Sequence, residues 1–96
     1  MISKSYQLKV NPDSLAANKI LASRYLQKSD NKKAEVYFRE AVRISPKDTE
    51  SNLGLALSLI KQKKINDGVS ILRNVLKMDP DNGTAMRYLR QLGLEK

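Results

Sequence analysis

The sequence contains no cysteine, no histidine and no tryptophan. The absence of cysteine excludes disulfide bonds and thiolate chemistry, and the absence of histidine removes the commonest general base and metal ligand. The acidic residues lie mostly in expected turns and helix starts, and no base, nucleophile and orienting group recur together. We therefore expect no enzymatic activity, no metal site and no cofactor.

Long hydrophobic runs are also missing. No apolar stretch approaches the roughly 20 residues needed to cross a bilayer, and the first 14 residues contain no continuous hydrophobic region of the signal-peptide kind. We expect a soluble, cytoplasmic protein. Aromatic residues make up only 5% of a chain that is 41% hydrophobic, which indicates a core of aliphatic and small side chains.

Positive charge is abundant. Lysine and arginine number 18 against 10 acidic residues, so the net charge is +8. Such an excess of positive charge favours a negatively charged partner, whether an acidic protein, a phosphate polymer or an anionic membrane surface. Charge alone does not choose among them.

The three prolines are evenly spaced. Pro12, Pro46 and Pro80 are separated by 34 residues in both intervals, and each follows a similar apolar and polar stretch. A constant spacing of 20 to 50 residues is typical of repeat proteins. The period predicts a short lead segment and three blocks, namely 1–14, 15–48, 49–82 and a partial third block at 83–96.

Each full block has the pattern of two helices. Apolar residues recur at spacings of three and four on both sides of a polar turn, "QKSDNKK" in the first block and "KQKKIND" in the second. We expect Ser14 or Asp13 to cap the first helix and Asn31 to cap the second. Gly93 is expected to end the single helix of the third block.

The residues within the period match a known family. The first block carries Leu21, Ala22, Tyr25, Ala34, Phe38, Ala41 and Pro46, and the second carries Leu55, Ala56, Leu59, Gly68, Leu72, Val75 and Pro80. This pattern resembles the tetratricopeptide repeat family. It departs from the family at Asn18 and Asn52, where tryptophan is common. The resemblance implies an all-α, right-handed α-α superhelix with two full repeats and a C-terminal capping helix.

The resemblance also implies a concave groove lined by the first helix of each block. The positions that transfer to this chain are Ala16, Lys19, Ser23, Leu26, Glu50, Leu53, Leu57, Ile60, Thr84, Arg87, Tyr88 and Gln91. Our hypothesis is that Leu53, Leu57 and Ile60 form the groove floor, and that Lys19 and Arg87 select an amphipathic peptide or helix bearing acidic residues. The alternative is that the two leucines only pack against the lead segment or the neighbouring helix.

Two further features bear on the groove. Some family members bind the terminal carboxylate of a partner with a set of lysine, asparagine and arginine residues, and here only Lys19 occupies one of those places. We therefore expect no such carboxylate site. Gly54 lies inside a predicted helix, at a cost of roughly 1 kcal/mol relative to alanine; it clears room either for a ligand backbone or for a close helix contact.

Lysines surround both polar turns. Stacking of the blocks should align them as a basic edge, defined by Lys28, Lys32, Lys33, Lys61, Lys63 and Lys64. This edge could bind nucleic acid or an anionic membrane, or it could be a solvated surface. The aromatic residues that accompany such charges in nucleic-acid binders are expected in the core, which favours the solvated surface.

The sequence thus predicts a protein-interaction adaptor or scaffold that captures a partner protein in the groove. The alternatives are a self-assembling repeat unit, since both ends expose apolar residues, and an electrostatic binder acting through the basic edge. The lead segment resembles the tail of a preceding second helix, which also fits a fragment of a longer array.

Overall fold

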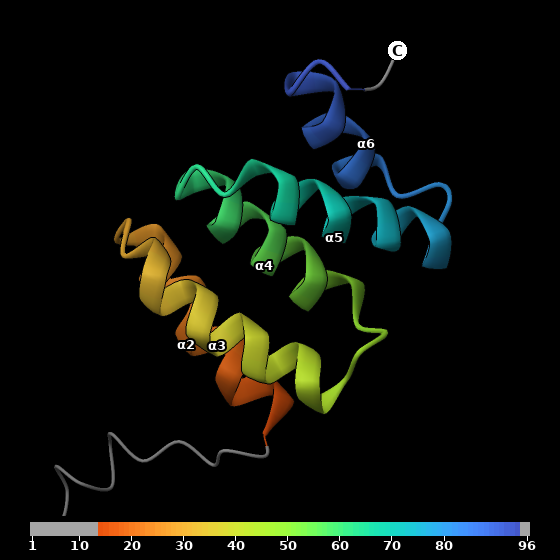
Figure 1. Cartoon of the computed structure of the whole chain (residues 1–96). Helices are drawn as coiled ribbons and strands as arrows, with labels where there is room; N and C mark the ends of the chain where they lie inside the picture. The colour runs from red at the N-terminus through yellow and green to blue at the C-terminus, as the bar shows by residue number, and fades with distance from the viewer. Residues whose placement is uncertain (1–13, 95–96) are drawn as a thin grey trace, which may run out of the picture.

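The computed structural model describes residues 14–94, and these residues form five α-helices and no strand. The helices stack in sequence order as two antiparallel pairs followed by one single helix (Figure 1). Their bounds are α2 Leu15–Gln27, α3 Asn31–Ile44, α4 Thr49–Lys61, α5 Ile65–Met78 and α6 Gly83–Gln91. The lead segment predicted at 1–14 lies outside the described residues except for Ser14. None of the helices formed by residues 14–94 has both the length and the apolar character needed to span a membrane.

Four of the helices begin at a side-chain cap. In each case a side-chain oxygen accepts a hydrogen bond from the backbone N–H three residues later, which satisfies one of the free amides of the first turn. The capping residues are Ser14, Asp30, Asp48 and Asn82. The predicted cap at Asn31 is wrong, because Asp30 caps α3 and Asn31 is its first helical residue. Lys64 precedes α5 and makes no side-chain cap.

The prolines end α3 and α5 through the residue that precedes them. A proline ring disfavours the helical conformation of the previous residue, and Ser45 and Asp79 accordingly have φ −138° and −142°, with ψ 85° at both. The chain therefore turns at Pro46 and Pro80 and starts the next helix. The constant spacing of these prolines explains why the two pairs have the same length.

The other helices end with one residue in the left-handed conformation. Ser29, Lys63 and Gly93 have φ 63°, 70° and 78° and follow α2, α4 and α6. After α6, the Leu94 N–H donates to the Leu89 carbonyl at 2.9 Å and the Gly93 N–H donates to the Arg90 carbonyl at 2.9 Å. This is the Schellman arrangement, and it confirms Gly93 as the helix stop.

The core consists of two clusters that share α4. The first core cluster contains Ala22, Ala34, Phe38, Leu55 and Leu59, and the second contains Ala56, Leu72, Val75, Ala85 and Leu89. Because α4 contributes to both clusters, the helix pairs form one continuous stack rather than separate domains. The small residues expected at close helix contacts are confirmed, since Ala22, Ala34 and Ala56 have no exposed surface.

Two glycines allow neighbouring helices to approach. A methyl group added to Gly54 would lie 2.3 Å from the Phe38 ring of α3, and one added to Gly68 would lie 2.6 Å from Ile60 of α4. Both distances are well below van der Waals contact. Gly54 therefore serves a helix contact and does not clear room for a ligand.

The asparagines that replace the family's tryptophan are buried. The Asn18 side chain donates to the Ser14 carbonyl at 2.9 Å, and Asn52 donates to the carbonyls of Pro46 and Asp48, both at 3.0 Å. These bonds satisfy carbonyls just before each helix and fix the turn that leads into it.

Candidate partner-binding groove

The first helices of the two pairs, α2 and α4, contact each other and enclose a shallow hollow of about 380 Å³. Its walls contain five of the residues predicted for the groove, together with Phe38 and Gly54. The five are Lys19, Ser23, Leu26, Glu50 and Leu53. The structure thus brings together residues that are about 30 positions apart in the sequence, with apolar side chains on the floor and charged side chains at one end.

The remaining predicted residues differ in their availability. Leu57 is half-buried on α4, one turn beyond Leu53. Leu53, Ile60 and Tyr88 are partly buried and pack against the second core cluster, so the fold itself uses part of their apolar surface. On α2, Ala16 is exposed. On α6, Arg87 and Gln91 are exposed and Thr84 is half-buried, and none of these three lines the hollow between α2 and α4.

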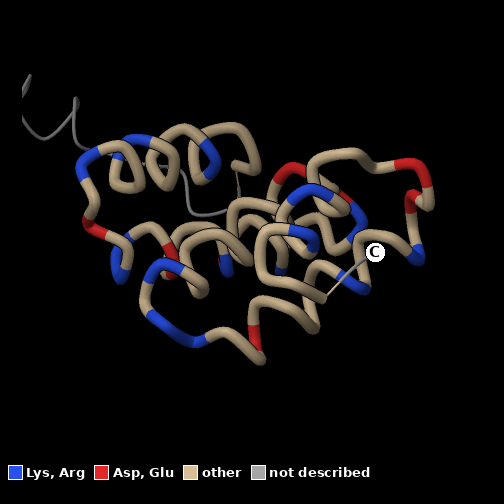
Figure 2. Tube along the Cα trace, turned by 90° about the horizontal axis from the view of Figure 1, so that it is seen from above, with Lys and Arg blue, Asp and Glu red and all other residues tan. Residues whose placement is uncertain are grey.

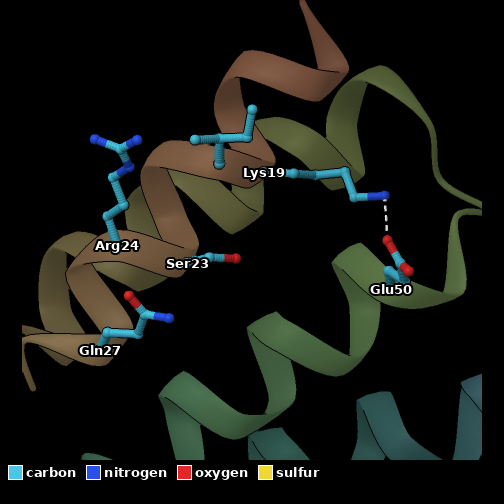
Figure 3. Close-up of a pocket in the computed structure, with 6 residues that line it drawn as sticks. Lys19, Ser23, Arg24, Gln27 and Glu50 are labelled. Carbon is cyan, nitrogen blue, oxygen red and sulfur yellow. Dashed lines mark ion pairs between the residues drawn. The ribbon is translucent and has the colours of Figure 1, made fainter.

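Lys19 lies across the groove rather than projecting toward an incoming partner (Figure 3). Its Nζ is 3.1 Å from Asp48 Oδ2 and 2.6 Å from Glu50 Oε1. The hydrogen bond with Glu50, helped by the one with Asp48, outweighs burial and raises the pKa of Lys19 above its ordinary value. One ammonium group therefore faces two carboxylates, so Lys19 is paired within the protein. That Lys19 selects an acidic partner stays a prediction.

Asp48 is fixed in place by the helix that it caps. The Ser51 N–H donates to Asp48 Oδ2 at 3.1 Å, and the Ser51 hydroxyl donates to the same oxygen. Burial raises the pKa of Asp48, but the bonds from Ser51 and Lys19 outweigh it and hold the pKa below its ordinary value. Asp48 is therefore an ionised partner for Lys19, held by its hydrogen bonds with Ser51.

A second hollow continues along α2 from the same ion pair. Lys19, Ser23 and Glu50 line it again, together with Ile20, Arg24 and Gln27. Figure 3 shows Arg24 and Gln27 one to two turns further along α2 than Lys19. The sequence analysis missed these three residues, although Ile20 and Arg24 are one turn apart and Gln27 follows Ser23 by one turn.

The tetratricopeptide repeat model matches residues 25–92, well over half of the chain. The chain belongs to the tetratricopeptide repeat family. Tetratricopeptide repeats generally mediate protein–protein interactions, and the family is typically a non-catalytic interaction module. The all-α helical repeat predicted from the sequence is confirmed.

The lysines predicted as a basic edge surround the two turns inside the tetratricopeptide repeats. All six are exposed, and the turns lie side by side in Figures 1 and 2. Part of this charge is already engaged, because Lys64 Nζ is 3.3 Å from Glu35 Oε1 and Lys33 Nζ is 5.3 Å from the centre of the Tyr25 ring. The carboxylate of Glu35 thus places a negative charge among the lysines of the basic edge, beside Lys64.

Glu35 of α3 also joins the two helix pairs. Gln62, which follows α4, donates to Glu35 Oε1 at 2.9 Å, and Arg39 donates to Glu35 Oε2 at 2.7 Å. Burial raises the pKa of Glu35, but the bonds from Gln62, Arg39 and Lys64 outweigh it and hold the pKa below its ordinary value. This carboxylate therefore has a structural role that the sequence pattern did not show.

Proposed function

We propose that the protein is an adaptor or scaffold that binds a peptide or helix of a partner protein in the groove between α2 and α4. The observation that carries the proposal is the hollow itself, which has an apolar floor of Leu26, Leu53 and the Phe38 edge. Apolar floors bordered by a few polar side chains are typical of peptide-binding grooves. The membership of the tetratricopeptide repeat family supports an interaction module.

Leu57 lies one helical turn beyond Leu53 on α4, and we propose that it extends this floor. Leu55 and Leu59, its neighbours on either side, are buried in the first core cluster, whereas Leu57 is half-buried. A helix that is apolar nearly all round is covered on more than one side, by its own fold or by a partner. The half-buried leucine therefore supports a partner at this position.

The test uses a peptide selected from a random display library against the full chain. We expect Leu57→Glu to weaken binding of that peptide strongly, because the carboxylate would be desolvated in the groove, while the helical circular dichroism is retained. The matched control is Val36→Glu. Val36 lies on α3 and is 60% exposed, so this substitution should leave peptide binding unchanged. Retained binding in the Leu57→Glu variant would remove the groove assignment.

A second candidate function is self-assembly through the outer face of α2. Ile20 is 56% exposed there and borders a small hollow with Ala17, Leu21 and Arg24. One period later, the equivalent face of α4 is packed against α3. Sedimentation over a range of concentrations tests this candidate, because an Ile20→Glu variant should remove any oligomer. A monomer at all concentrations in the unmodified chain would eliminate it.

A further inference from the structure

We propose that the groove selects a partner segment that places a lysine or arginine against Glu50, next to apolar side chains that contact Leu26 and Leu53. This inference rests on the proposed function and adds the chemistry of the partner. It reverses the sign of the charge that the sequence suggested at this end of the groove. The reason lies in how the charged residues around Lys19 are arranged.

The ion pair between Lys19 and Glu50 belongs to both hollows. Both side chains line the hollow above Leu53 and also the hollow that extends along α2. The pair joins α2 to α4 across the space between them (Figure 3). A partner segment that lies in both hollows must therefore pass over this ion pair or replace it. The charge that the partner places next to the pair then determines whether the segment is attracted or repelled.

Of the three charged groups, Glu50 is the one available to a partner. The side chains of Lys19 and Asp48 are only 25% and 22% exposed, whereas that of Glu50 is 76% exposed. Asp48 is held by Ser51 and neutralises Lys19 without help from Glu50. One positive and two negative charges therefore meet at Lys19, and Glu50 carries the excess negative charge at the hollow between α2 and α4. Arg24 adds a positive charge in the second hollow, along α2.

The bond that Glu50 makes with Lys19 is readily exchanged. Ion pairs with a solvent-exposed member contribute little, because water screens them and ordering the side chains costs entropy. A cation from a partner can replace Lys19 at Glu50 while Lys19 stays with Asp48. A partner carboxylate in the hollow between α2 and α4 would lie beside the carboxylate of Glu50 and a lysine that Asp48 already neutralises, so it would be repelled.

The apolar part of the partner follows from the adjacent floor. Leu26 of α2 and Leu53 of α4 line the same hollow as Glu50, together with the small exposed part of Phe38. A basic residue flanked by aliphatic or aromatic residues fits this arrangement, since the long stem of lysine or arginine also packs on apolar surface.

The experiment compares peptide libraries selected against the full chain and against three variants. We expect the unmodified protein to enrich peptides with a lysine or arginine at a fixed distance from an apolar pair. Glu50→Gln should lose the preference for the basic residue, and Glu50→Lys should replace it with aspartate or glutamate. The control Glu40→Lys changes a carboxylate of α3 that is paired with Arg43 outside the groove, and it should enrich the same peptides as the unmodified protein.

Affinity measurements complete the test. A peptide selected with the unmodified protein should bind Glu50→Lys about fivefold or more weakly, which corresponds to the loss of one exposed ion pair and the gain of a repulsion. Circular dichroism and thermal unfolding establish that each variant is folded, as expected for a residue as exposed as Glu50.

The two proposals fail in different ways. If no common sequence is enriched, or if Leu57→Glu binds the selected peptide as tightly as the unmodified protein does, the groove is not the binding site. A different result would be an apolar consensus that depends on Leu57 but carries no basic residue, or carries an acidic residue instead. The groove would then remain the binding site, and the proposed role of Glu50 would be overturned.

Discussion

Replacing Gly54 with alanine is the sharpest test of how the helices pack. The added methyl group would lie 2.3 Å from Cε1 and Cζ of Phe38 and 2.7 Å from Cδ1. Carbon atoms normally approach to about 3.5–4.0 Å, so the ring would have to move by more than about 1 Å. Phe38 is only 4% exposed and is enclosed by Ala22, Ala34 and Leu55, so little free space is present for that movement.

Two effects of opposite sign determine the magnitude. Alanine is favoured over glycine inside a helix by about 1 kcal/mol, whereas overpacking a dense core typically costs about 1–3 kcal/mol. Because three ring atoms are involved, we take the upper half of that range and expect a net loss of about 1–2 kcal/mol. For a domain of this size the loss corresponds to a decrease in Tm of roughly 5–15 °C.

Thermal unfolding followed by circular dichroism measures the effect, with two glycines as references. Nothing lies within 4 Å of a methyl group added to Gly83, so Gly83→Ala should be neutral or slightly stabilising. Gly68→Ala should fall between the two, because the nearest atom belongs to Ile60, a flexible side chain. In a Phe38→Leu background, Gly54→Ala should lose most of its cost. If Gly54→Ala stabilises the protein as much as Gly83→Ala does, the inference that Gly54 is needed for the close packing of α3 on α4 is wrong.

Three further predictions concern charge and backbone. Lys63→Gly should raise the free energy of unfolding by about 1 kcal/mol, because lysine is strained at φ 70°; a denaturation midpoint that falls instead would contradict this. Since Asp48 has a lowered pKa when folded, its ionic contribution is present above the unfolded pKa of about 4 and is lost as the pH falls through the folded value. The Tm difference between the unmodified chain and Asp48→Asn should therefore be constant from about pH 5 to 8 and decrease toward zero at lower pH. A difference that persists at acid pH would argue against the ion pair. Replacing three lysines of the basic edge by serine should leave the affinity for a groove-selected peptide within about twofold and its salt dependence shallow, as fluorescence anisotropy would show; the lysines concerned are Lys28, Lys32 and Lys61.

The repeat period predicted most of the fold because the residues that recur in it are those that the turns and the close helix contacts need. Pro46 and Pro80 mark the same turn in each unit, and small residues such as Ala22 and Ala56 mark the same close contact. The left-handed residues Ser29 and Lys63 also follow the period, but they were not predicted. Neither is glycine, so residue type gave no signal of a positive φ, and only their equivalent positions could have indicated a shared turn.

Asn18 and Asn52 show a different limit. Against the family pattern they are departures, because tryptophan is common at their place. In the structure each is buried and donates to carbonyls at the start of its helix. A polar residue in a core position is stable only when its hydrogen bonds are made, and those partners are backbone groups that a side-chain pattern cannot reveal.

The charge of the groove could not be derived from the period, because the residues that decide it do not repeat. Lys19 has Leu53 and Arg87 at its equivalent positions, and it is neutralised by residues of the next unit. A family pattern assigns a face to each residue, whereas the sign of a site depends on which side chain of the opposite helix reaches it. Asp48 reaches Lys19 because it caps α4 at the proline turn, so a residue that stabilises a helix end also contributes to the electrostatics of the groove. An aspartate cap in this place therefore pairs with the neighbouring lysine, and under our proposal the exposed carboxylate of Glu50 becomes the charged contact with the partner.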